Sequence, residues 1–123
     1  MKFREIKLKS GTRIFLGKNA ENNDDLMKEF RGKTNIIMHT AIPGSPFCII
    51  EKLNPTREDI KESAVICASK SQDWRDNKKD VDIHLFDGKS VKKPFFAKKG
   101  TWKITGKAKT IKVKREEIRK FLK

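Results

Sequence analysis

The residues of this sequence that could do chemistry include two histidines, two cysteines and a polar run at residues 14–26, IFLGKNAENNDDL. A glycine lets the backbone approach a ligand, and a helix N-terminus attracts anions, so this run has the composition of a phosphate-contacting turn. Its carboxylates, however, would repel a phosphate at the helix start. We therefore expect Asn19, Asn23 and Asp24 to fix the turn and cap the helix, and Lys18 to point to the anion.

The histidines and cysteines do not have the spacing of a metal site or of a nucleophile with its base. Cys48 and Cys67 lie 19 positions apart among apolar neighbours, which predicts two buried free thiols and a reducing, cytoplasmic compartment. His39 ends an apolar run and is expected to be a hydrogen-bonded structural residue, whereas His84 alternates outward and is expected to be exposed. We expect no metal, no cofactor and no catalytic residue.

Positive charge is concentrated in the last third of the chain. Residues 1–88 carry 16 Lys and Arg against 14 acidic residues, whereas residues 89–123 carry 14 against 2. A lysine-rich face can serve solubility alone. Segregation this strong favours a polyanion partner, because lysines that neutralise phosphates release counterions and bind nucleic acid with strong salt dependence. No apolar run is long enough to span a bilayer, so no membrane partner is expected.

The elements that must position these residues follow an α+β pattern in one domain, residues 1–123. Apolar residues alternate on both sides of Ser10 and Gly11, which predicts a β-hairpin. Residues 21–31 have the pattern of a helix, and NIIMHT and FCIIE predict two central strands. We expect a mixed or antiparallel sheet, built from two hairpins and the central strands and packed with two main helices.

The second helix and the C-terminal half complete this pattern. Thr56 and Asp59 resemble a capping box, followed by a face of mostly small residues: Ile60, Ala64, Cys67, Ala68 and Ser71. VDIHLF predicts a further strand. A second hairpin is expected to turn Trp102, Ile104, Ile111 and Val113 inward and Lys103, Lys112 and Lys114 to the opposite face. Residues 115–123 predict a short C-terminal helix.

The order of the motifs resembles the NFACT-R domain, the RNA-binding module of fibronectin-binding-like proteins that act in ribosome quality control. The polar run is similar to the family signature at Gly17, Asn19, Asn23, Asp24 and Leu26, with Lys18 in place of the usual Arg. Four further segments are similar to family motifs, and they contain His39, then Gly44 and Ser45, then Ser71 and Arg75, and then Lys93 and Gly100. KTIKV is similar to the closing strand of the family. Asn35, Ile37, Met38 and Pro46 depart from the pattern. The resemblance covers residues 3–114.

The resemblance implies a stand-alone domain that binds structured RNA, rRNA or tRNA on the ribosome, through backbone phosphates. The residues expected to contact nucleic acid are Lys18, His39, Arg75, Lys92, Lys93, Lys98, Lys99, Lys103, Lys112 and Lys114. Those expected to maintain the motif are Gly17, Asn19, Asn23, Asp24, Gly44, Ser45, Ser71 and Gly100. A DNA-binding or protein-interaction adaptor that uses the same basic face is the alternative, and an enzyme acting on RNA ranks third.

Overall fold

A six-stranded antiparallel sheet lies at the centre of the computed structural model, which describes residues 2–40, 42, 45–93 and 98–123. The strand order is β1-β2-β4-β3-β5-β8. The strands are β1 (Arg4–Lys7), β2 (Arg13–Leu16), β3 (Ile36–His39), β4 (Cys48–Ile50), β5 (Val81–Asp87) and β8 (Lys109–Val113). The predicted α+β class with an antiparallel sheet is confirmed.

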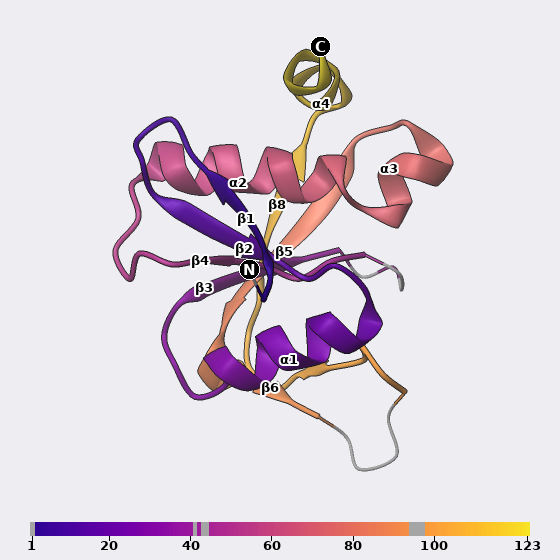
Figure 1. Cartoon of the computed structure of the whole chain (residues 1–123). Coiled ribbons are helices and arrows are strands. Elements are labelled where there is room, and N and C mark those ends of the chain that lie inside the picture. The colour runs from indigo at the N-terminus through magenta and orange to yellow at the C-terminus, as the bar shows by residue number, and fades with distance from the viewer. Residues whose placement is uncertain (1, 41, 43–44, 94–97) are drawn as a thin grey trace.

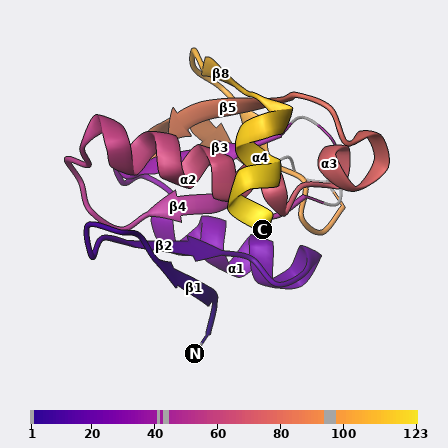
Figure 2. The same ribbon diagram turned by 90° about the horizontal axis from the view of Figure 1, so that it is seen from above.

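The two faces of the sheet are covered by different elements (Figures 1 and 2). Helices α2 (Arg57–Ser69) and α4 (Arg115–Leu122) lie on one face, with the short α3 (Gln72–Asn77) following α2. Helix α1 (Ala20–Phe30) and a two-stranded ribbon of β6 (Val91–Lys92) and β7 (Lys103–Ile104) lie on the other. We call these the α2 face and the α1 face. Each face buries its own apolar cluster, as side-chain alternation along the strands requires.

The N-terminal elements form as predicted. β1 and β2 pair as a hairpin around Ser10 and Gly11, and the Leu8 amide donates to the Thr12 carbonyl at 2.7 Å. α1 begins one residue earlier than predicted, and it buries Leu26 and Met27 completely under the sheet. Cys48 of β4 is also fully buried, as is Cys67 of α2; both are free thiols, as expected, and burial raises the pKa of the Cys48 thiol.

Helix α2 begins with the predicted capping box. The Asp59 amide donates to Thr56 Oγ1 at 3.1 Å, and the Thr56 amide donates to Asp59 Oδ2 at 3.2 Å. Ala64 and Ala68 pack against the sheet with almost no exposed surface. The helix ends at Ser69, so the expectation that Ser71 continues its inward face is wrong. Ser71 instead caps α3, because its hydroxyl oxygen accepts from the Trp74 amide at 3.1 Å.

The hairpin predicted between residues 102–104 and 111–113 does not form. β7 pairs with β6, where Ile104 lies opposite Val91, while β8 pairs with β5 at the edge of the main sheet. Lys103 therefore does not share a sheet face with Lys112 and Lys114. Ile104 and Trp102 pack on the α1-face cluster beside Val91, and this burial favours the β6–β7 pairing over a hairpin between β7 and β8. The predicted C-terminal helix is present as α4.

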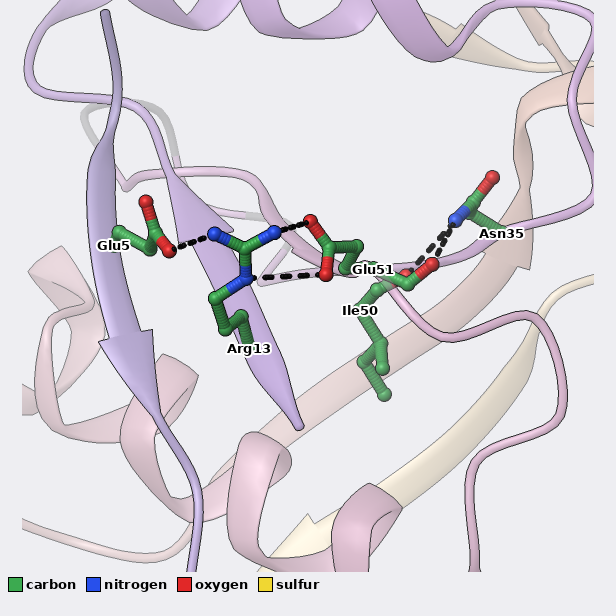
Figure 3. Close-up of polar contacts among 5 residues, drawn as sticks. All are labelled: Glu5, Arg13, Asn35, Ile50 and Glu51. Carbon is green, nitrogen blue, oxygen red and sulfur yellow. Dashed lines mark hydrogen bonds and ion pairs between the residues drawn. The ribbon is translucent and has the colours of Figure 1, made fainter. Parts of the chain in front are cut away.

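Polar contacts tie β1, β2 and the ends of β3 and β4 together (Figure 3). Arg13 bridges Glu5 of β1 and Glu51, which follows β4. The buried Asn35 amide donates to the Ile50 carbonyl at 3.0 Å and the Glu51 carbonyl at 2.9 Å. A carboxylate could not donate these bonds, so the asparagine that departs from the family pattern has a structural function here.

Candidate nucleic-acid interface

An open cleft of about 930 Å³ lies on the α1 face. Its described lining comes from β1, the turn before α1, β3 and the residues after it, the end of α2, α3, β5, residues 99–106 and β8. These segments are far apart in the sequence, and most of them carry one of the motifs on which the family resemblance rests. The cleft therefore lies where the fold brings those motifs together.

Polar residues of neighbouring strands form the floor of the cleft. His39 of β3 lies opposite His84 of β5, which in turn lies opposite Thr110 of β8. The Thr110 hydroxyl and His84 Nδ1 are 3.3 Å apart. His84 is half-buried rather than exposed as predicted, because β8 and the cleft walls flank it. The floor thus offers hydrogen-bonding groups that carry no fixed charge.

His39 is held neutral and in one orientation. Burial lowers its pKa to about 4, and this effect outweighs the hydrogen bond to the Ser45 carbonyl, which acts in the opposite direction. Its Nε2 lies 3.1 Å from that carbonyl, so Nε2 carries the proton and donates. The ring stacks on Phe47 with centroids 4.1 Å apart and planes 18° apart. The structural role expected for His39 is confirmed.

The turn before α1 forms one wall. Asn19 is the N-cap residue as predicted, and its Oδ1 accepts from the Asn22 amide at 2.8 Å. Asn23 bridges to the next segment, since its amide donates to the Ser45 carbonyl at 3.4 Å and its Oδ1 accepts from the Phe47 amide at 3.1 Å. A Cβ on Gly17 would lie 1.8 Å from that Oδ1, so only glycine fits beside this bridge.

Asp24 does not cap α1 as expected but holds the opposite wall. Its Oδ1 accepts from Lys93 Nζ at 3.0 Å, the Gly100 amide at 2.9 Å and Trp102 Nε1 at 2.9 Å. Burial alone would raise the Asp24 pKa, but these three hydrogen bonds and the Lys93 charge outweigh it and hold the pKa below its ordinary value. Gly100 has φ +79° and passes close to Ala20, so it suits this contact. We call this cluster the Asp24 clasp.

Serine hydroxyls position the third wall. Ser45 Oγ accepts from the Thr40 hydroxyl and from the backbone amide of Gln72, each at 2.9 Å. The Gln72 contact fixes the start of α3, and α3 carries Arg75 to the cleft. Gly44, which the sequence places in the same motif, lies outside the described residues.

Cationic side chains surround the cleft, and none of its described lining residues is acidic. Four of these cations were expected from the sequence: Lys18, Arg75, Lys99 and Lys103. Two were not expected: Arg4 and Lys70. Arg75 also donates to Gln72 Oε1 at 2.8 Å. A rim of cationic side chains favours an anionic partner.

The other predicted lysines lie away from the cleft lining. Lys93 belongs to the Asp24 clasp and is mostly buried. Lys112 lies 3.8 Å from the exposed carboxylate of Asp82. Three further lysines are exposed: Lys92 in β6, Lys98 next to Lys99, and Lys114 directly after β8. The structure thus brings together only part of the predicted lysine set.

The sequence matches the family described as the NFACT protein RNA-binding domain over residues 2–106. The chain belongs to this family. It is also 25% identical over 103 residues to a protein named as the archaeal Rqc2 homologue aRqcH of Methanocaldococcus jannaschii. That match covers 79% of this chain and 15% of the relative, so the chain corresponds to a small part of that protein.

The fold of this chain is also found in a solved structure. The C-terminal part of the fibronectin/fibrinogen-binding protein from Streptococcus suis matches 98% of this chain and 49% of its own chain, with a TM-score of 0.81 and 24% identity. At this identity the likeness shows the fold alone. Within the part of the chain that the structure describes, no helix has the length and apolar character needed to cross a membrane.

In this NFACT RNA-binding domain, sequence reasoning missed Arg4, Lys70 and Trp102 as lining residues of the cleft. Arg4 and Lys70 lie in segments whose overall charge is nearly balanced, so no local excess of lysine marked them. Trp102 was expected to face inward, and it does pack on the apolar cluster, but it also lines the cleft. An aromatic next to lysines, as in GTWKI, is the signal that could have identified it.

Proposed function

We propose that this chain binds structured RNA, rRNA or tRNA, through backbone phosphates, without catalysing a reaction on it. Membership of an RNA-binding family supports the polymer class. The observation that carries the proposal is the rim of cationic side chains without a carboxylate among the described lining of the cleft. Each lysine or arginine that neutralises a phosphate releases condensed counterions, and this release drives binding.

The proposed phosphate contacts are divided between the cleft and the surface around it. The cleft contributes Lys18, Arg75, Lys99 and Lys103, with Arg4 and Lys70 beside them. The exposed lysines Lys92, Lys98, Lys112 and Lys114 extend the positive surface. Lys93 and the neutral His39 would act mainly by holding the walls and floor in place, since their polar atoms already bond to Asp24 and Ser45.

The proposed setting is the ribosome, in translation quality control, in the cytoplasm. The relative named as an Rqc2 homologue and the family resemblance support it. Because the chain spans 15% of that relative, any activity of the longer protein would need segments that have no counterpart in the matched region.

Salt dependence of RNA affinity tests the proposal. Changing Lys98, Lys99 and Lys103 together to Gln should make the slope of log affinity against log salt shallower by about 2 to 3 units, if each lysine neutralises one phosphate. The matched control changes Lys28, Lys52 and Lys79 to Gln; all three are exposed and none lines the cleft. Equal weakening by both variants would mean that only net charge attracts RNA.

A panel of tRNA, duplex RNA and duplex DNA at two salt concentrations separates the alternatives. Preference for an RNA supports the proposal. Equal binding to all three would favour an adaptor that recognises any phosphate backbone, and cleavage of any of them would indicate an enzyme. Absence of binding to every nucleic acid would overturn the proposed function.

A further inference from the structure

The cleft differs from the rest of the basic surface because it encloses a volume lined by aromatic rings and polar side chains. Exposed lysines can contact the phosphates of any helix from outside. The cleft volume of about 930 Å³ lies near the upper end of the range, about 300 to 1,000 Å³, of sites that enclose small organic molecules. A base-paired RNA presents its backbone to a protein and keeps its bases stacked inside. Contacts with the RNA backbone alone would leave the inside of the cleft empty.

Flat rings and uncharged polar groups lie inside the cationic rim. Trp102, Phe47 and His39 all line the cleft. Their orientations are already fixed: His39 stacks on Phe47, and the Trp102 indole donates to Asp24. Bases stack on such fixed rings without regard to sequence, and base edges can hydrogen-bond to side chains such as His84 and Thr110 on the floor. Rings inside and cations outside match the two chemical parts of a nucleotide.

We propose that the cleft takes one or two unpaired nucleotides of the bound RNA, with a base inserted among Trp102, His39 and His84 and the flanking phosphates at Lys18, Lys99 and Arg75. The inference rests on the proposed RNA binding and narrows it: the preferred ligand is a loop, bulge or single-stranded end rather than a continuous duplex. A stem beside the unpaired segment would lie along the exposed lysines outside the cleft.

The experiment compares two RNAs of the same stem sequence, a hairpin with an unpaired loop and a blunt duplex, by fluorescence anisotropy at fixed salt. The hairpin should bind about tenfold more tightly, the gain expected from stacking one base. The variant Thr110→Leu adds bulk to the floor and keeps every cation, and it should reduce the hairpin preference below threefold. Thr34→Leu, an exposed position outside the lining, is the matched control.

Photocrosslinking gives a second readout that does not depend on affinity. A hairpin with 4-thiouridine in the loop should crosslink to peptides that contain Trp102, His39 or His84. Equal affinity for hairpin and duplex, or crosslinks that map only outside the cleft lining, would overturn this inference and leave the proposed RNA binding intact. If neither RNA binds, the proposed function fails and this inference with it. A circular-dichroism melt of each variant excludes unfolding as the cause of any loss.

Discussion

Three neighbouring strands, β3, β5 and β8, present opposite chemistry on their two faces. On the α2 face they carry apolar residues, Met38, Ile83 and Ile111, which join the large buried cluster. The residue next to each of these in its strand lies on the α1 face; these neighbours are His39, His84 and Thr110. Since neighbouring residues of a strand point to opposite sides, one stretch of sheet serves as core on one side and as cleft floor on the other.

The covering elements explain why only one face keeps a cleft. α2 and α4 close the α2 face, and Ile118 of α4 is completely buried. On the α1 face, α1 packs its apolar residues on β2, β3 and β4 through Leu26, Met27 and Phe30. The β6–β7 ribbon covers another part, and the start of α1 and residues 99–106 both line the cleft. The α1 face is therefore less completely covered over the polar residues of β3, β5 and β8.

The largest expected effect comes from breaking the Asp24 clasp. Asp24→Ala removes the acceptor of three donors and leaves the mostly buried Lys93 ammonium without its carboxylate, which should lower the free energy of unfolding by roughly 3 kcal/mol. Urea unfolding at pH 7 measures the change. RNA affinity should fall as well, because the clasp holds residues 99–104 at the cleft.

A second Lys–Asp pair on the same face is the matched control. Asp82 lies 3.8 Å from Lys112, and both side chains are more than half exposed. Exposed pairs contribute about 0 to 1 kcal/mol, so Asp82→Ala should change stability little. Similar losses in the two variants would show that the clasp has no special importance for this face.

The next effect is a pH dependence from His39. The folded-state pKa of His39, about 4, lies below the ordinary value of 6.5, so the unfolded chain binds the proton more readily and stability falls as the pH drops from 6.5 to 4. The loss should reach about 3 kcal/mol at the lower end, from 1.36 kcal/mol for each pKa unit. Urea unfolding at pH 7, 5.5 and 4.5 measures it, and His39→Gln should flatten the profile.

Asp59 and Asp24 act outside this pH range. Hydrogen bonds lower the pKa of Asp59, and the largest effect comes from the Ser10 hydroxyl. The contacts of the Asp24 clasp lower the pKa of Asp24. Carboxylates with lowered pKa values stabilise the fold above their ordinary value of 3.8, and this contribution is lost only as the pH falls below about 4. An unchanged slope between pH 6.5 and 4 in His39→Gln would therefore contradict the assignment to His39.

Local patterns predicted the helices and most strands because their signals lie within a few residues. The Thr56 capping box and the alternation around Ser10 and Gly11 are of this kind, and the structure confirms both. The helical turn after Ser71 was missed, since one serine gives a weak signal for a helix of six residues.

Pairings over long separations could not be predicted. The alternation of Trp102 and Ile104 fits any neighbouring strand, and only the burial opposite Val91 decides the partner. Lys93 and Asp24 are 69 residues apart, so nothing local distinguished this lysine from the exposed ones. The motif residues around the cleft were predicted as a set, whereas their contacts with one another depend on the folded chain.

The smallest effects should come from adding bulk to each face of the sheet. On the closed α2 face, Ala68 is completely buried, so Ala68→Leu should overpack the contact and lower the free energy of unfolding by about 1 to 3 kcal/mol. On the open α1 face, Thr110 is exposed, and Thr110→Leu should change stability by no more than about 0.5 kcal/mol. Thermal melts of the two variants measure the difference. A loss for Thr110→Leu as large as that for Ala68→Leu would mean that the cleft is closed in solution, since added side-chain volume is costly only where no space exists to receive it.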